Sequence, residues 1–437
     1  MPDLPLTYEF SDGWIRRGVT VDVAADSMTL RVPGLSPGAV ASVETVTGRR
    51  EFAEVRAVHG SLARCVPLGR VDGIPAGSAA SSSEARLGAF VGMNLLGAVT
   101  DAWGRSEDRA PGRVVSARPA TLDLRERDSV GQMLRTGVFA IDAMLSLGCG
   151  QRIALTAGSG AGKSTLLRSI VKHADVDARV IALIGERARD AVETIDKLRD
   201  SPTWTSTTVV LAAADAAPIE RFWAARTATA QAEWLCSTGR RVLLAMDSLT
   251  RVAAAWRELS LIAGEPPAHR GYPPSMIGAL ASLVERAGPR RCGSITAVYA
   301  ILVDGDDPFE PVTDAVRGLL DGHILLSRRL CDAGRFPAID VLRSLSRTMP
   351  DVASEDHLAA ASLVRRMLAT LEEYEDLFAI GAYRPGADAW LDACVGTRSA
   401  LQSALYDDRG TSVPAECRLA EIAERLRAAA GLGPDGA

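Results

Sequence analysis

At positions 157–165 the chain reads Ala157-Gly158-Ser159-Gly160-Ala161-Gly162-Lys163-Ser164-Thr165. The segment Arg152 to Thr156 before it predicts a strand, and Leu166 to Val171 after it has the pattern of a helix. A strand, a glycine-rich loop and a helix in this order are what a phosphate-binding loop requires. Small residues let backbone N–H groups surround phosphates, and the helix N-terminus adds partial positive charge. The segment therefore predicts a nucleotide site.

The residues of this loop have distinct expected roles. Lys163 is expected to contact the β- and γ-phosphates of a nucleotide, and the Ser164 hydroxyl is expected to ligate Mg²⁺. Ala157 stands where the general pattern has glycine, a departure that leaves this mechanism intact. The predicted nucleotide-binding residues are Gly158, Ser159, Gly160, Ala161, Gly162, Lys163, Ser164 and Thr165.

Two carboxylates follow further predicted strands. Hydrolysis of a nucleotide needs a second group on Mg²⁺ and an oriented water molecule. Asp247 ends an apolar run, which is the place for a carboxylate of the magnesium shell, although such a residue can also simply form a turn. Glu186 follows another run and could polarise the attacking water. From the residues alone, an ion pair of Glu186 with Arg187 or Arg189 is an equal alternative.

The composition indicates a globular enzyme without a membrane segment. Apolar residues make up 47% of the 437 residues, enough to fill a large core. No run reaches the roughly 18 apolar residues of a membrane helix, and the start MPDLPLTYEF lacks the features of a signal peptide, so we expect a cytoplasmic protein. The net charge of −5 argues against a protein that is basic overall, as many nucleic-acid binders are.

The cysteines are widely spaced and form no CxxC pair, which argues against a zinc or redox centre. We interpret them as ordinary buried thiols. They are Cys65, Cys149, Cys236, Cys292, Cys331, Cys394 and Cys417.

The pattern along the chain predicts three domains. Residues 1–88 carry short apolar stretches between close turn signals, typical of a small β-barrel or sandwich, and the serine-rich residues 77–83 predict a loop or linker. From about residue 150 apolar strands alternate with helix-length segments, which predicts an α/β domain with a largely parallel sheet, and we assign residues 89–350 to this domain. Residues 351–437 predict a helical bundle. The expected strands of the sheet are Arg152 to Thr156, Val180 to Ile184, Thr208 to Ala212, Val242 to Met246 and Ile295 to Leu302.

Several segments together resemble the catalytic subunits of type III secretion and flagellar export ATPases. Pro337 to Ser346 matches the signature that these proteins share with the rotary ATP synthase α and β subunits. Agreement in order and spacing over about residues 90–390 makes the resemblance more specific than any single motif. The other matching segments are Gly185-Glu186-Arg187, Met246 to Arg251, Gly264 to Pro267, Arg270 to Ser275 and Asp321-Gly322-His323.

The resemblance implies a RecA-like P-loop ATPase core between an N-terminal β-barrel and a C-terminal helical domain. It also implies an enzyme that hydrolyses ATP with Mg²⁺. On the matching positions, Lys163 and Ser164 contact the phosphates and Mg²⁺, Glu186 acts on the catalytic water, and Asp247 belongs to the magnesium shell.

Two arginines acquire expected roles from the same resemblance. Arg347, directly after Ser346, resembles the arginine finger of the family, which acts on the nucleotide of the neighbouring subunit. Arg187 belongs to the matching segment beside Glu186 and is counted with the expected catalytic residues.

The implied partners follow from the family. The resemblance implies a homohexamer at the cytoplasmic face of the inner membrane, in contact with stator or stalk and export-gate proteins. It implies that secretion chaperones and exported proteins are released, unfolded and delivered there. Ala188-Arg189-Asp190 stands where the family usually has Gly-Arg-Glu, and this drift favours an injectisome over a flagellar system.

Three alternatives compete with this interpretation. A rotary ATP synthase subunit would need a second subunit type, whereas Lys163, Glu186 and Arg347 stand together in this chain. An RNA-translocating hexamer would grip its strand with a basic N-terminal domain, but residues 1–85 carry eight Arg or Lys against ten Asp or Glu. A nucleotide-binding scaffold without activity would require the loss of Glu186 or Asp247, and both are present.

Overall fold

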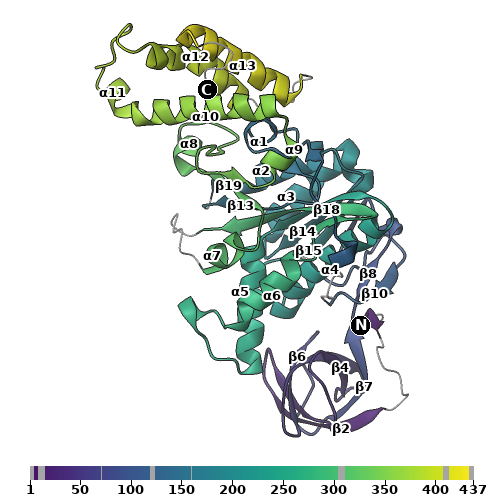
Figure 1. The fold of residues 1–437 in the computed structure, drawn as a ribbon. Helices are drawn as coiled ribbons and strands as arrows, with labels where there is room; N and C mark the ends of the chain where they lie inside the picture. The colour runs from purple at the N-terminus through teal and green to yellow at the C-terminus, as the bar shows by residue number, and fades with distance from the viewer. Residues whose placement is uncertain are drawn as a thin grey trace.

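Three parts follow one another along the molecule (Figure 1). A computed structural model describes residues 4–7, 15–69, 71–118, 124–158, 160–303, 311–406 and 413–432. The N-terminal strands form a barrel at one end, a sheet covered by helices fills the middle, and the C-terminal helices pack at the other end. This architecture is the one that the sequence predicts.

The N-terminal part is a closed β-barrel. Its strands are β1 (Leu6–Thr7), β2 (Arg16–Val23), β3 (Met28–Arg31), β4 (Ala39–Glu44), β5 (Arg50–His59), β6 (Leu62–Pro67) and β7 (Ala79–Leu87). The order is β7-β2-β3-β6-β5-β4, pairing of β4 with β7 closes the ring, and β1 adds to β7. Residues such as Leu30, Val43 and Val55 fill the interior, because alternate side chains of a strand point to one face.

The serine-rich stretch is a strand, so the expected loop or linker is wrong. Ser81, Ser82 and Ser83 lie within β7, which pairs with β2 and with β4. The Ser82 hydroxyl donates to the Val40 carbonyl at 2.8 Å, and the hydroxyls of Ser81 and Ser42 are 2.9 Å apart across the strands. Serine favours loops when its hydroxyl forms hydrogen bonds with its own or neighbouring backbone groups. Here the hydroxyls instead find partners on the adjacent strands.

The middle part is a largely parallel sheet. Its strands are β9 (Ala98–Thr100), β13 (Arg152–Ala157), β14 (Ala178–Ile184), β15 (Thr207–Ala212), β16 (Arg241–Asp247), β17 (Gly288–Arg290), β18 (Gly293–Leu302), β19 (Gly322–Leu326) and β20 (Leu345–Ser346). The order is β20-β19-β13-β18-β16-β14-β15-β9, with β17 beside β18. Of these strands β17 and β20 are antiparallel to their neighbours. Each predicted strand is confirmed within two residues at either end.

Helices cover both faces of this sheet. The first face carries α2 (Lys163–His173) and α3 (Ala188–Arg199), and the second carries α4 (Pro218–Ser237), α5 (Leu249–Ala263), α6 (Ser275–Val284) and α7 (Pro311–Arg317). Alternation along β13 turns Leu155 toward the α2 face and Ala154 toward the α4 face. The two hydrophobic cores therefore meet at the sheet.

The C-terminal part is helical, as predicted. It consists of α10 (Glu355–Glu373), α11 (Glu375–Ala379), α12 (Ala389–Leu405) and α13 (Ala415–Ala430), which pack near α1 (Phe139–Met144). The apolar residues Val364 and Met367 of α10 and Leu426 of α13 are fully buried. The Ser354 side chain caps α10 by accepting from the His357 backbone N–H. Among the helices of the described ranges, none is long and apolar enough to cross a membrane.

The cysteines are less uniformly buried than the sequence interpretation expects. Cys65, Cys149, Cys236 and Cys394 are buried, but Cys331 is half-buried, and Cys292 and Cys417 are exposed. Cysteine is buried in most proteins, but residue type alone does not show which side of a turn or helix faces water.

Candidate active site

The glycine-rich loop connects β13 to α2, as predicted. Gly160 and Gly162 have φ of 80° and 84°, left-handed conformations that residues with a Cβ rarely adopt. Gly162 directly precedes α2, so the helix begins at Lys163, earlier than the predicted helical run from Leu166. Ser159 lies outside the described residues. Lys163 and the residues after it thus stand at a helix N-terminus, where partial positive charge favours phosphate.

The side chains of Lys163 and Ser164 both contact the carboxylate of Asp247. Lys163 Nζ forms an ion pair with Asp247 Oδ1, and the Ser164 hydroxyl donates to Asp247 Oδ2 at 3.0 Å. Lys163 and Asp247 expose only 7% and 2% of their surface. Buried charges are stable when they are paired. Lys163 therefore neutralises Asp247, a structural role in addition to the one expected toward phosphate.

The donor set around Asp247 fits a magnesium ion. Asp247 and Ser164 offer oxygen atoms, the donors that Mg²⁺ prefers. Asp247 reaches the phosphate loop because β16, β18 and β13 are parallel neighbours, so their carboxyl ends meet at one edge of the sheet. The predicted metal residues are thus adjacent.

Glu186 lies beside the same cluster. It follows β14, whose Leu183 pairs with Asp247, and it is half-buried. Burial raises the pKa of Glu186, the charge of Asp247 raises it further, and Lys163 is the main charge that opposes the shift. Among the described residues no ion pair joins Glu186 to Arg187 or Arg189. A half-buried carboxylate with a raised pKa at the edge of a phosphate loop is suited to accept a proton.

The other predicted loop residues are less closely joined to this cluster. Arg187 is exposed and directly precedes α3. Among the described residues it makes no side-chain ion pair, so its catalytic role stays a prediction. Ala161 is buried under the loop, whereas Thr165 is exposed on α2.

Arg347 lies away from the phosphate loop of its own chain. It follows β20, in which Ser346 pairs with Gly322 at the start of β19, and its backbone N–H donates to the Asp321 carbonyl at 2.9 Å. The phosphate loop follows the opposite end of β13, about 13 Å of strand away.

The two also differ in the face of the sheet that they use. The cavity lined by Arg347 is also lined by Ala154 and Thr156, whereas Leu155 packs toward α2. Of the predicted catalytic residues, the structure therefore brings Lys163, Glu186 and Asp247 together and leaves Arg347 at the edge strand.

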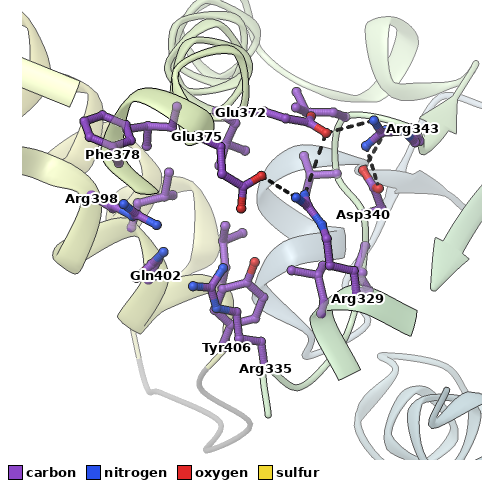
Figure 2. Close-up of a pocket in the computed structure, with 18 residues that line it drawn as sticks. Arg329, Arg335, Asp340, Arg343, Glu372, Glu375, Phe378, Arg398, Gln402 and Tyr406 are labelled. Carbon is purple, nitrogen blue, oxygen red and sulfur yellow. Dashed lines mark hydrogen bonds and ion pairs between the residues drawn. The ribbon is translucent and has the colours of Figure 1, made fainter. Parts of the chain in front are cut away.

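Phe336 lies beside the phosphate loop, and the sequence analysis did not single it out. It is 45% exposed, and its Cε1 lies 3.7 Å from the position of a Cβ built on Gly162. The neighbouring Arg335 lies over the ring of Tyr406 with 5.7 Å to the centroid (Figure 2). In the sequence, Phe336 directly precedes the signature Pro337 to Ser346, so its aromatic side chain was visible but lay outside the matched segment. Its exposed ring beside the loop offers a flat surface for a base.

The chain matches two known family descriptions. Residues 137–346 match the ATP synthase alpha/beta family, nucleotide-binding domain, and residues 353–424 match the C-terminal domain of the type III secretion ATPase EscN. The first match covers the phosphate loop and four predicted catalytic residues, Lys163, Glu186, Arg187 and Asp247. The fifth, Arg347, lies one residue beyond it.

Individual relatives cover most of the chain. The flagellum-specific ATP synthase of Treponema pallidum is 43% identical over 81% of this chain and 80% of that protein. The SPI-2 type 3 secretion system ATPase of Salmonella typhimurium is 40% identical over 91% of this chain and 92% of that protein. The assembled ATPase EscN of enteropathogenic E. coli, solved in complex with its central stalk EscO, has a TM-score of 0.83 at 35% identity over 94% of this chain and 100% of that chain. These similarities extend through the barrel, the nucleotide-binding part and the C-terminal helices, so the chain belongs to the family of type III secretion and flagellar export ATPases and is an ATP-hydrolysing enzyme.

Proposed function

We propose that this chain forms a ring of six identical subunits that hydrolyses Mg-ATP to energise protein export through a type III secretion system. The observation that carries the proposal is the position of Arg347. It directly follows the edge strand β20, on the face of the sheet away from α2, while Lys163, Glu186 and Asp247 are gathered at the loop. A complete site therefore needs two copies of the chain.

Within one subunit the residues at the loop bind and position the nucleotide. Lys163 exchanges its ion pair with Asp247 for the more highly charged phosphates, and Ser164 and Asp247 are then the residues that hold the metal. When bound, Mg²⁺ neutralises charge that develops on the phosphates. Glu186 orients the water and accepts its proton, and its raised pKa makes it a stronger base than an exposed glutamate.

The neighbouring subunit supplies Arg347. Charge spreads over the oxygens of the γ-phosphoryl group in the transition state, and a guanidinium placed there is worth about 10³ to 10⁵ in rate. Arg347 is exposed and lies at the sheet edge formed by β20, so it can reach an adjacent subunit. A ring in which each edge faces the next phosphate loop gives identical sites without a second subunit type.

Phe336 is assigned to the base of the nucleotide. Its exposed ring lies beside Gly162, on the same side as the loop that receives the phosphates. Stacking on an aromatic side chain suits a nucleotide base of any identity.

The export role rests on the relatives. EscN was solved with a central stalk, and we propose that a stalk protein, export-gate proteins and secretion chaperones with their cargo also contact this ring at the cytoplasmic face of the inner membrane. We favour an injectisome over a flagellar system because of the drift at Ala188-Arg189-Asp190. Neighbouring genes provide the test, since needle and translocator genes accompany the first system and hook and rod genes the second.

Mixed rings test the shared site. Lys163→Ala and Arg347→Ala are each expected to be nearly inactive alone. When the two variants co-assemble at equal amounts, about a quarter of the sites combine an intact Lys163 with an intact Arg347 from the neighbour. ATPase activity is therefore expected to return in the mixture.

Co-assembly must be shown separately, by pulling down one tagged variant with the other. A mixture that co-assembles and regains no hydrolysis would mean that Arg347 serves its own subunit or has only a structural role. Lys163→Ala also removes the buried partner of Asp247, so thermal unfolding of this variant has to be measured beside its activity.

A further inference from the structure

A second arginine shares the cavity of Arg347. Arg317 is the last residue of α7, and it lines the same cavity as Arg347, His323 and Leu345 at the edge formed by β19 and β20. Both arginines are exposed. The two guanidinium groups therefore present positive charge together on one edge of the sheet.

Neither guanidinium has an anionic partner among the described residues. Nearby arginines differ: Arg343 is bonded to Asp340 at 2.9 Å and to Glu372 at 2.8 Å (Figure 2). Like charges in one cavity repel each other, so the arrangement is unfavourable unless an anion comes from outside.

Burial and the positive charge of the two arginines lower the pKa of His323. Its ring lines the same cavity as the two arginines, and its Nε2 is 2.9 Å from the Arg343 carbonyl. Burial lowers the pKa of His323, and the charges of Arg317 and Arg347 lower it further, against the bond to the carbonyl. The histidine is therefore not a third cation that competes for the same anion at neutral pH.

We propose that Arg317 acts with Arg347 on the phosphate groups of the nucleotide held by the neighbouring subunit. The inference rests on the proposed ring and deepens it by adding a second residue to the shared half of the site. Phosphate oxygens are the anions that suit two adjacent guanidinium groups, because each group can donate two parallel hydrogen bonds. A triphosphate or the transferred phosphoryl group offers enough oxygens for both.

The alternative is that Arg317 acts on the nucleotide of its own subunit. Arg317 also lines a second cavity, which reaches Gly158 at the start of the phosphate loop of its own chain. The two arrangements differ in which copy must carry the arginine, so mixed rings distinguish them.

The single variants come first. Arg317→Ala is expected to lower kcat/KM for ATP by about 10- to 100-fold, the usual worth of a hydrogen bond to a charged group. Arg317→Lys keeps the charge but cannot donate two parallel hydrogen bonds as a guanidinium does, so a smaller loss of kcat/KM is expected. Arg425→Ala, which removes the same charge from an exposed position on α13, is the control and is expected to match the parent enzyme. Unchanged kcat/KM in both Arg317 variants would overturn the proposal.

Two mixtures of variants then show which subunit supplies Arg317 to a given nucleotide site. Arg317→Ala with Lys163→Ala is expected to regain activity, because about a quarter of the sites combine an intact lysine with an intact Arg317 from the neighbour. Arg317→Ala with Arg347→Ala is expected to regain none, because no single edge then carries both arginines.

The opposite pattern assigns Arg317 to its own site. In that case the mixture of Arg317→Ala with Arg347→Ala recovers and the mixture with Lys163→Ala does not, and the proposal is withdrawn. The mixture of Lys163→Ala with Arg347→Ala tests the ring separately. Recovery there without recovery for Arg317→Ala and Lys163→Ala would overturn this inference and leave the proposed function standing.

Discussion

Lys163, Asp247 and Glu186 show how the site holds its charges close together. Asp247 is buried, and both of its carboxylate oxygens have a partner, one in Lys163 and the other in Ser164. Glu186 stands beside this pair without an ion-pair partner of its own among the described residues. One carboxylate is thus suited to hold a metal and the other to handle a proton.

Glu186→Gln is expected to bind nucleotide and to hydrolyse it at least about 100-fold more slowly. The amide keeps the shape of the side chain but cannot accept a proton, and loss of a general base costs this much. Binding is measured with a fluorescent ATP analogue and turnover by phosphate release. Normal binding together with more than about a tenth of the parent rate would remove Glu186 from proton handling.

The pH dependence of kcat/KM is expected to reflect the raised pKa of Glu186. The base works when ionised, so activity falls as pH drops through its pKa. Burial and Asp247 raise that pKa, and the acid limb should therefore lie above the value of about 4.3 of an exposed glutamate. An acid limb at the ordinary value, or one that persists unchanged in the residual activity of Glu186→Gln, would contradict the assignment.

Phe336→Ala is expected to weaken ATP binding by about 10-fold, because base stacking on an aromatic ring is worth about 1–3 kcal/mol. Phe336→Tyr retains the ring and is the matched control. Equilibrium titration with a fluorescent ATP analogue gives both constants. If the alanine variant binds the analogue as tightly as the parent, the nucleotide base does not stack on Phe336.

At the scale of elements, β5 and α4 join the barrel to the nucleotide-binding part. Glu54 on β5 is 2% exposed and accepts a hydrogen bond from Trp223 Nε1 on α4 at 3.0 Å. Arg56, on the same strand, lies 3.7 Å from the Glu54 carboxylate and 5.0 Å above the ring of Trp256 on α5. These contacts link the two parts through buried polar groups and aromatic rings.

Glu54→Ala is expected to lower the free energy of unfolding by about 2–3 kcal/mol, since it leaves the Trp223 N–H and the Arg56 charge without a partner. Urea denaturation followed by tryptophan fluorescence measures the loss. Glu44→Ala removes an exposed carboxylate from β4 and is expected to change little. Similar losses in both variants would show that the buried contact is not important for stability.

At the scale of the whole molecule, the phosphate loop follows the interior strand β13, whereas Arg347 follows the edge strand β20. In the proposed ring the catalytic unit is a pair of neighbouring subunits, and a lone subunit carries only the nucleotide-binding half. The proposal therefore couples activity to assembly.

Specific ATPase activity is therefore expected to rise steeply with protein concentration. Dilution below the range in which rings form separates each phosphate loop from the neighbouring Arg347. Light scattering and specific activity measured over the same dilution series provide the check. Constant specific activity of a monomeric protein would contradict the shared site.

The sequence predicted those features that depend on neighbouring residues. The glycine positions of the loop, the apolar strands and the helical stripes follow from local backbone preferences and from the periods of strands and helices, and they were confirmed. Matching segments in the right order then indicated the family. The serine-rich strand β7 was missed because hydroxyl partners on β4 are far away in the sequence.

What tertiary structure alone decided is how these local features meet. Parallel pairing brings Asp247 onto Lys163, and the antiparallel pairing of β20 puts Arg347 at the start of β19. The same fold places Arg317 in the cavity of Arg347, and Phe336 beside the loop. Strand order and register are set by contacts between residues far apart in the chain, so no local pattern contains them. The sequence thus determined the chemistry that this protein carries, and the three-dimensional pairing of its strands determined which of those groups stand together in one subunit.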